Sequence, residues 1–237
     1  KIIKTGDEYI HAMNAGEGIY RYKNLNDSTI YYNHTIQRLA QNYRYSFIRV
    51  ALTLIEKNQF EKANQLLISM DEYFPLESIE IIDPTIQIVI SQALYSVNNF
   101  ELFDKYIINA SNKENLSPSN FIDLGQYIEA FIKNYEIKKE ELSTSDDIIY
   151  SQIVNNYDEI DVLLNLYIDA HEKYPEDYRI LHLLSYEYIK KGEYDLAIDK
   201  INTWILNNPT NKNYKEAQDW LDIVTDYYNN LTAKENQ

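Results

Sequence analysis

Apolar residues between positions 33 and 74 recur at the three- and four-residue spacing of amphipathic helices. The pattern predicts two helices, over 33–57 and 60–74, with polar residues at the turn between them. The apolar positions of the first helix are Phe47, Val50, Ala51, Leu54 and Ile55. Those of the second helix are Ala63, Leu66, Leu67 and Met70. The small alanine side chains leave room for the two backbones to approach closely, and Pro75 ends the hairpin.

The segment 180–209 repeats this helical hairpin at matching offsets. Pro175 and Pro209 lie 34 residues apart, which is the period of tetratricopeptide repeats. Because one such hairpin cannot bury its apolar face alone, we predict an all-α fold of tetratricopeptide-like hairpins stacked as a solenoid. A solenoid offers a long surface, so the repeat favours binding over catalysis. The packing positions of this hairpin are Leu181, Leu184, Tyr188, Ala197 and Ile201, with Gly192 at the turn.

Further helical segments extend the prediction to one elongated domain or two lobes. Hairpins are predicted at 86–110 and 148–174, and a helix begins at Pro118, with Ser117 as its N-cap. The charged segment before Ile148 lacks periodicity and is interpreted as a linker. The predicted organisation is an irregular N-terminal segment that packs on the repeats (1–32), a first lobe (33–137), a linker (138–147) and a second lobe (148–237) with a C-terminal capping helix.

The composition indicates a folded, acidic chain. Apolar residues make up 45% of the 237 positions, and the net charge of −15 disfavours a nucleic-acid partner. The absence of cysteine excludes disulfides and thiolate metal sites. No apolar run approaches the roughly 20 residues of a membrane-spanning helix. Since the chain begins with Lys and shows no signal-peptide pattern, we expect it to be part of a longer protein.

Residues that could support catalysis or bind a metal are sparse, and we predict no catalytic residue, no metal site and no cofactor. The four histidines are scattered, and His171 and His182 fall near apolar helix faces, as packing residues do. Acid clusters at 146–147 and 158–161 have the residue types of a glycosidase acid–base pair, which leaves a helical glycosidase as an alternative. Both clusters fall at predicted helix starts, where acids favour the helix dipole, so we interpret them as structural.

Tyrosine is unusually abundant, with 23 residues. Most of these tyrosines fall at helix-packing spacings, which favours a role in the core. The alternative is a tyrosine-rich surface that binds carbohydrate or peptide.

One segment is more specific than the repeats. It contains Tyr20-Arg-Tyr-Lys-Asn-Leu-Asn-Asp27, Tyr31-Tyr32-Asn33 and Arg38-Leu-Ala-Gln-Asn-Tyr-Arg44, followed by the first hairpin. This order resembles the region after the last membrane span in a family of bacterial multi-span membrane proteins, common in the Bacteroidetes, that is similar to protein O-mannosyltransferases of the GT-C superfamily. The resemblance covers about residues 7–135. The chain departs from the family pattern at Asn24, at 28–29 and at His34.

The resemblance implies that the chain is the soluble C-terminal part of a membrane glycosyltransferase-like protein, with its catalytic acids in a membrane part that is absent here. It places the chain on the extracytoplasmic face of the bacterial inner membrane, in the periplasm. We therefore predict a non-catalytic domain that binds a protein or peptide partner, with its oligomeric state left open. The alternative is a free-standing tetratricopeptide scaffold, cytoplasmic or periplasmic, unrelated to glycosylation. Candidate binding residues from the family motif are Tyr22, Leu25, Asn26, Asp27, Tyr31, Tyr32, Asn33, Arg38, Asn42 and Arg44.

Overall fold

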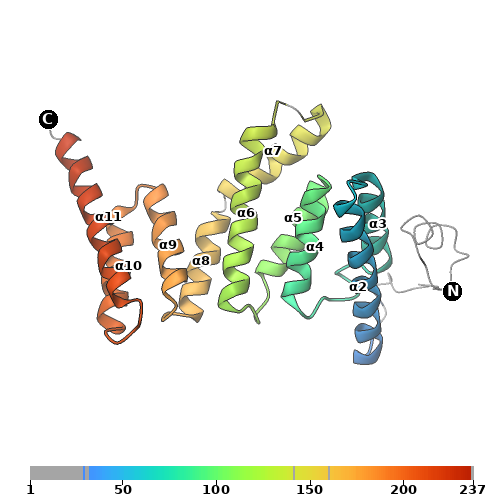
Figure 1. Cartoon of the computed structure of the whole chain (residues 1–237), viewed down its shortest axis with the longest axis horizontal. Coiled ribbons are helices and arrows are strands. Elements are labelled where there is room, and N and C mark those ends of the chain that lie inside the picture. The colour runs from blue at the N-terminus through green and yellow to red at the C-terminus, as the bar shows by residue number, and fades with distance from the viewer. Residues whose placement is uncertain (1–28, 30–31, 141, 160, 236–237) are drawn as a thin grey trace, which may run out of the picture. The chain divides into compact units, whose positions relative to one another are not determined.

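The computed structural model describes residues 29, 32–140, 142–159 and 161–235, and the parts of the chain it describes contain α-helices and no β-strand (Figure 1). The all-α prediction is therefore confirmed. The predicted N-terminal segment 1–32 lies outside the described residues, apart from Thr29 and Tyr32.

The chain divides into two compact units, Lys1–Asn115 and Leu116–Gln237. This division differs from the two lobes that we predicted, because the helix that begins at Pro118 belongs to the second unit instead of the first. The predicted linker at 138–147 holds only a short connection between two helices of that second unit.

The described residues of the first unit form two helical hairpins. Helix α2 (His34–Glu56) packs on α3 (Phe60–Tyr73), and α4 (Pro84–Ser96) packs on α5 (Phe100–Ser111), with α2 also against α4. Ala51 and Ala63 are fully buried, as the close approach of α2 and α3 requires. The hairpin pattern read from the sequence is thus reproduced in this unit.

The second unit contains six helices among its described residues, and each packs on a neighbour in the unit. Their bounds are α6 (Pro118–Lys138), α7 (Thr144–Glu159), α8 (Val162–Lys173), α9 (Tyr178–Lys190), α10 (Tyr194–Asn207) and α11 (Tyr214–Glu235). Ser117 caps α6 as predicted, because its hydroxyl accepts a hydrogen bond from the Asn120 backbone N–H. Contacts run from α8 to α9, from α9 to α10 and from α10 to α11.

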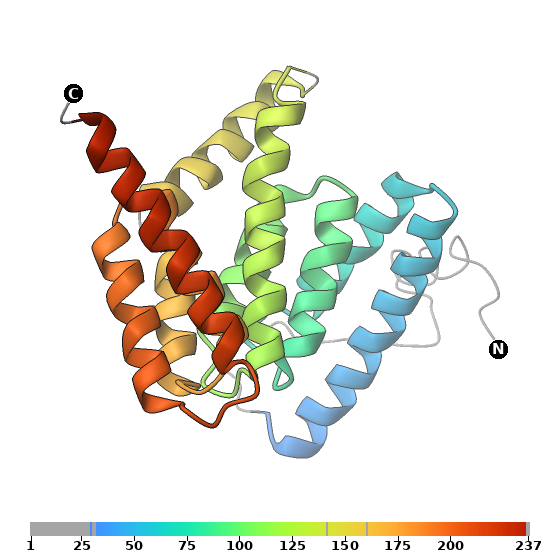
Figure 2. The ribbon, with the colours of Figure 1, turned by 60° about the vertical axis from the view of Figure 1, so that its left-hand side comes forward.

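Helix α7 interrupts the hairpin that α6 and α8 form. We predicted that the two helices in 148–174 pair with each other, but α8 packs mainly on α6 and α9. The apolar side of α7 lies on α6 instead, where the Tyr150 ring centroid is 4.3 Å from that of Phe131. Figure 2 shows α7 leaning away from the upper end of α6 before the chain returns to α8.

The acid clusters occupy different ends of α7. Asp146 and Asp147 lie in its first turn, as predicted. Asp158 lies in the last turn, so the prediction of a helix start is wrong for this residue. Asp161, which precedes α8, has a left-handed backbone (φ 50°) and forms an ion pair with Lys191.

Three hairpins share the same backbone feature at their turns. Asn58, Asn98 and Gly192 have φ values of 56°, 57° and 78°. Each stands two residues before the second helix of its hairpin. A left-handed residue after a helix C-terminus lets the chain reverse while its N–H still satisfies a helix carbonyl. The three hairpins thus share one turn geometry.

Candidate binding surface

The described residues of the family motif do not all lie on one exposed surface. Tyr22, Leu25, Asn26, Asp27 and Tyr31 lie outside the described residues. Tyr32 is buried, and the Asn33 side chain caps α2 by accepting a hydrogen bond from the Ile36 N–H at 3.0 Å. Arg38 and Asn42 are exposed on α2, whereas Arg44 is completely buried.

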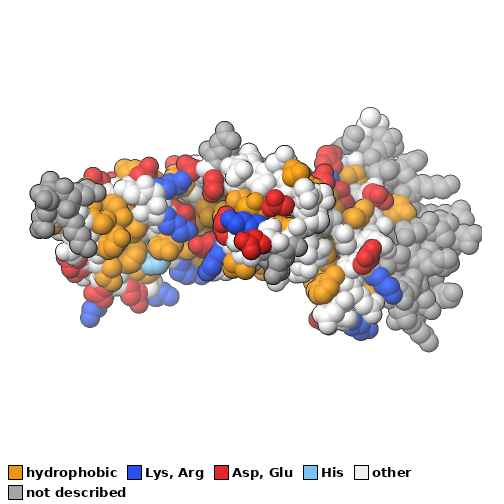
Figure 3. All heavy atoms as spheres, turned by 90° about the horizontal axis from the view of Figure 1, so that it is seen from above, with side chains coloured by type: hydrophobic (Ala, Val, Ile, Leu, Met, Phe, Trp, Pro, Cys, Tyr) orange, Lys and Arg blue, Asp and Glu red, His pale blue; other side chains and the backbone are white. Residues whose placement is uncertain are grey.

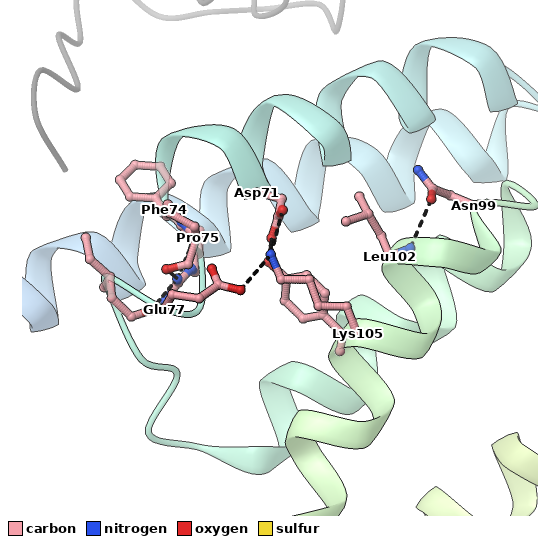
Figure 4. Close-up of polar contacts among 10 residues, drawn as sticks. Asp71, Phe74, Pro75, Glu77, Asn99, Leu102 and Lys105 are labelled. Atoms are coloured by element: carbon pink, nitrogen blue, oxygen red, sulfur yellow. Dashed lines mark hydrogen bonds and ion pairs between the residues drawn. The ribbon is translucent and has the colours of Figure 1, made fainter. Parts of the chain in front are cut away.

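Arg44 fastens the segment that follows α3. Its Nη2 donates hydrogen bonds to the carbonyl oxygens of Phe74 and Ile79, and it lies 3.5 Å from the Pro75 carbonyl oxygen. Figure 4 shows Phe74 and Pro75, which follow the end of α3. Burial lowers the pKa of the Arg44 guanidinium to about 10, against opposing effects of Tyr106 and Asp71, so it stays charged at neutral pH. The Arg44 side chain forms hydrogen bonds with the protein's own backbone, so we interpret it as a structural residue.

A second polar cluster joins α3 to α5 near Arg44. Asp71 accepts a hydrogen bond from the Tyr106 hydroxyl at 2.9 Å and pairs with the Lys105 ammonium at 3.0 Å. Lys105 also lies 3.3 Å from a Glu77 carboxylate oxygen (Figure 4). Burial, and then Asp71, raises the pKa of Tyr106 well above its usual value, so its hydroxyl stays protonated and donates. Every group of this cluster has a partner within it, so we interpret the cluster as structural: it links α3 to α5.

The strongest candidate for a binding surface lies in the second unit, on helix α9. Arg179, His182, Tyr186 and Lys190 follow one another at helical spacings and line one side of α9. This side lies away from the packing residues Leu181, Leu184 and Tyr188. Tyr186 is 43% exposed, and the Lys190 ammonium lies 5.0 Å from its ring centroid.

Helix α11 continues this surface. Trp220, Ile223 and Tyr227 share one side of α11, at spacings of three and four residues. Ile223 is 59% exposed and Tyr227 is 53% exposed, so two large apolar side chains lie open on this side of α11. Seen from above, hydrophobic side chains gather beside the C-terminal end of α11 (Figure 3).

Ring contacts join the two helices. The His182 ring centroid is 4.7 Å from that of Trp220, and the Trp220 Nε1–H donates to the Ser185 hydroxyl at 2.9 Å. The Tyr178 hydroxyl donates to the Glu216 carbonyl oxygen at 3.2 Å. We call the surface formed by Arg179, His182, Tyr186, Lys190, Trp220, Ile223 and Tyr227 the α9–α11 face.

The cations of the α9–α11 face are already paired. Lys190 lies 3.0 Å from a Glu129 carboxylate oxygen and 2.8 Å from one of Glu187. Arg179 pairs with Asp177 at 2.7 Å. The hydrogen bond from Arg179 is the main reason that the pKa of Asp177 is lowered. These contacts leave little net positive charge on α9.

The acids of α11 differ from those of α9. Glu216, Asp219, Asp222 and Asp226 follow one another with no base between Lys215 and Lys234. None of the ion pairs found in the described ranges includes Asp219, Asp222 or Asp226. Burial raises the pKa of Tyr178, and the negative charges of Glu216 and Asp219 raise it further.

His171 and His182 fit a packing role. Burial lowers the pKa values of both His171 and His182, and Lys200 lowers that of His171 further. Both imidazoles therefore favour the neutral form in the folded chain. In the parts of the chain that the structure describes, no group of three or more His, Asp or Glu residues is placed to hold a metal ion.

Comparisons with known proteins identify no family for this chain. The sequence matches no model of a protein family, and no curated protein matches it. Across the described helices, none combines the length and apolarity needed to cross a bilayer.

Sequence reasoning missed the α9–α11 face. Its signal was present, because Tyr186, Ile223 and Tyr227 are large apolar residues outside the packing positions of their helices. Tyrosine is abundant, and most tyrosines fall at packing positions. The sequence pattern therefore does not separate the exposed tyrosines from those of the core.

Proposed function

We propose that this chain is a non-catalytic, tetratricopeptide-like module that binds a protein or peptide partner on the α9–α11 face. The observation that carries the proposal is the exposure of Tyr186, Ile223 and Tyr227 on two helices joined by the His182–Trp220 contact. Large aromatic and aliphatic side chains at the centre of an interface supply most of its binding free energy.

The solenoid part of the proposal rests on the repeats. The 34-residue spacing of Pro175 and Pro209 agrees with the tetratricopeptide period. The left-handed residues at Asn58, Asn98 and Gly192 support a common hairpin design. In repeat proteins of this kind, one side of the stack commonly serves as the binding surface.

A membrane glycosyltransferase-like parent, with this chain on its extracytoplasmic side, is the wider setting that we propose. Its support is the resemblance of the segment from Tyr20 to Pro75 to the tail of that family. Buried Arg44 belongs to the motif of that segment, and its contacts with the Phe74 and Ile79 carbonyls give the motif a structural reason. The alternative remains a free-standing scaffold. The coding sequence upstream of Lys1 separates the two, since eight or more apolar spans support the first proposal and none supports the second.

Photo-crosslinking tests the binding face directly. A photoreactive phenylalanine analogue is placed at Tyr186 or Tyr227 in the protein expressed from its own locus, and adducts are resolved by mass spectrometry. We expect one protein partner to be captured from both positions, because both side chains are exposed and belong to the proposed face.

Leu206 is the matched control, since it is 79% exposed on α10 and lies outside the α9–α11 face. Equal capture from positions 186, 206 and 227 would indicate random collision and count against the face. A lack of any adduct at Tyr186 and Tyr227, with normal abundance of the protein, would reject it.

A further inference from the structure

We propose, as an extension of the proposed function, that the α9–α11 face binds a cationic peptide segment. In this segment a Lys or Arg neighbours an aliphatic or aromatic side chain. The apolar side chain packs on Ile223 and Tyr227, and the cation pairs with Asp219 or Asp226.

The placement of the acids around Ile223 is the first argument. Asp219 precedes Ile223 by four residues and Asp226 follows it by three, so both carboxylates border this exposed side chain on the helix surface. Ile223 and Tyr227 are also four residues apart. The outer side of α11 therefore presents an apolar strip with a carboxylate at each end of Ile223.

The second argument is that these acids have no cation in the described protein. Asp219 is three residues from Asp222, and Asp222 is four residues from Asp226, and like charges at these spacings repel and destabilise a helix. A bound Lys or Arg relieves this repulsion. An anionic or neutral segment would gain nothing from the acids and would face their desolvation.

The third argument is that α9 offers no competing site for an anion. Lys190 is shared by Glu129 and Glu187, and Arg179 is held by Asp177. The charge left to attract a partner is thus negative, in line with the net charge of −15. This selects against nucleic acid and acidic peptides, and a surface of this sign speeds the approach of a cationic partner.

Peptide selection against the full chain tests the inference. Random 12-residue peptides displayed on phage are selected, and the peptide of the most enriched clone is titrated by fluorescence anisotropy. A version with each Lys and Arg replaced by Gln is titrated in parallel. We expect enrichment of peptides that combine Lys or Arg with Leu, Ile, Phe or Trp. The Gln version should bind about three- to tenfold more weakly, as exposed ion pairs allow.

Charge variants of the protein supply the matched comparison. D219N/D226N should weaken the selected peptide by a similar factor and flatten the dependence of its affinity on salt, because the screened interaction is gone. D169N/D199N removes two exposed acids from α8 and α10, outside the face, and should bind within twofold of the wild type.

The outcomes separate this inference from the proposed function. Peptides enriched without Lys or Arg, or affinity unchanged by D219N/D226N, would overturn the cationic occupant while leaving a peptide-binding face. If I223S/Y227S keeps its helical circular dichroism and still binds every selected peptide at wild-type affinity, then the face itself is rejected, and both proposals fall.

Discussion

Gly125 of α6 lies directly against the ring of Tyr167 of α8. A Cβ atom at position 125 would be 2.9 Å from Tyr167 Cε1 and closer still to Cζ and the hydroxyl oxygen. Glycine costs a helix about 1 kcal/mol relative to alanine, so its presence inside α6 needs a packing reason. This close approach supplies the reason, and it is what allows α8 to pair with α6 across the inserted helix α7.

We expect G125A to destabilise the second unit by about 1–3 kcal/mol through overpacking, despite its better helix propensity. Chemical denaturation followed by circular dichroism measures the change. Y167L is destabilising on its own, but in its background G125A should become neutral or stabilising. If the effects of the two substitutions simply add, the steric explanation is wrong.

Arg44→Met should destabilise the first unit by about 2–4 kcal/mol, because it leaves the buried carbonyls of Phe74 and Ile79 without their donor. Arg38→Met removes the same charge from an exposed position on the same helix, and should change the free energy of unfolding by less than about 0.5 kcal/mol. Equal effects in a urea titration would mean that Arg44 does not fasten the segment after α3.

The buried alanines of the two hairpins should not tolerate enlargement. A63L and A197L place a larger side chain at fully buried positions, and each should cost about 1–3 kcal/mol. A233L makes the same change on the exposed side of α11 and serves as the control. Unfolding midpoints unaltered in A63L and A197L would contradict the packing of these hairpins.

Protonation of the two half-buried histidines should weaken the fold below neutral pH. Burial lowers the pKa values of His171 and His182 in the folded chain, so the unfolded chain binds more protons as the pH falls below about 6.5. The stability from this source is complete above that pH and is lost as the pH falls through the folded-state values. Comparison of melting temperatures at pH 7.5 and 5.5 measures the loss. The drop should shrink in H171Q/H182Q, and a drop of unchanged size would assign it to the carboxylates.

Asp158 lies in the last turn of α7, where the helix dipole opposes a negative charge. D158N should therefore stabilise the chain slightly, by about 0.3–1 kcal/mol at low ionic strength. D146N, in the first turn of the same helix, should have the opposite sign. The two substitutions, compared by urea denaturation at low and high salt, test the assignment of the helix ends.

Local sequence patterns predict the helices, because helix formation depends on residues three and four apart. The periodic apolar residues, the Ser117 cap and the buried alanines at 51 and 63 are local signals, and the structure agrees with each of them. The hairpin turns were equally local, since an Asn or Gly in a left-handed conformation at positions 58, 98 and 192 reverses the chain.

Which helices pair, and which side chains stay exposed, depends on the packing of the whole fold. Periodicity identifies the apolar side of a helix but does not say what covers it, so the pairing of α6 with α8 and the division before α6 were beyond its reach. Arg44 was predicted as a candidate binding residue, and its burial depends on carbonyl partners that are 30 and 35 residues away in the sequence. The α9–α11 face has the same origin, because the exposure of Ile223 and Tyr227 depends on how many neighbours pack on α11.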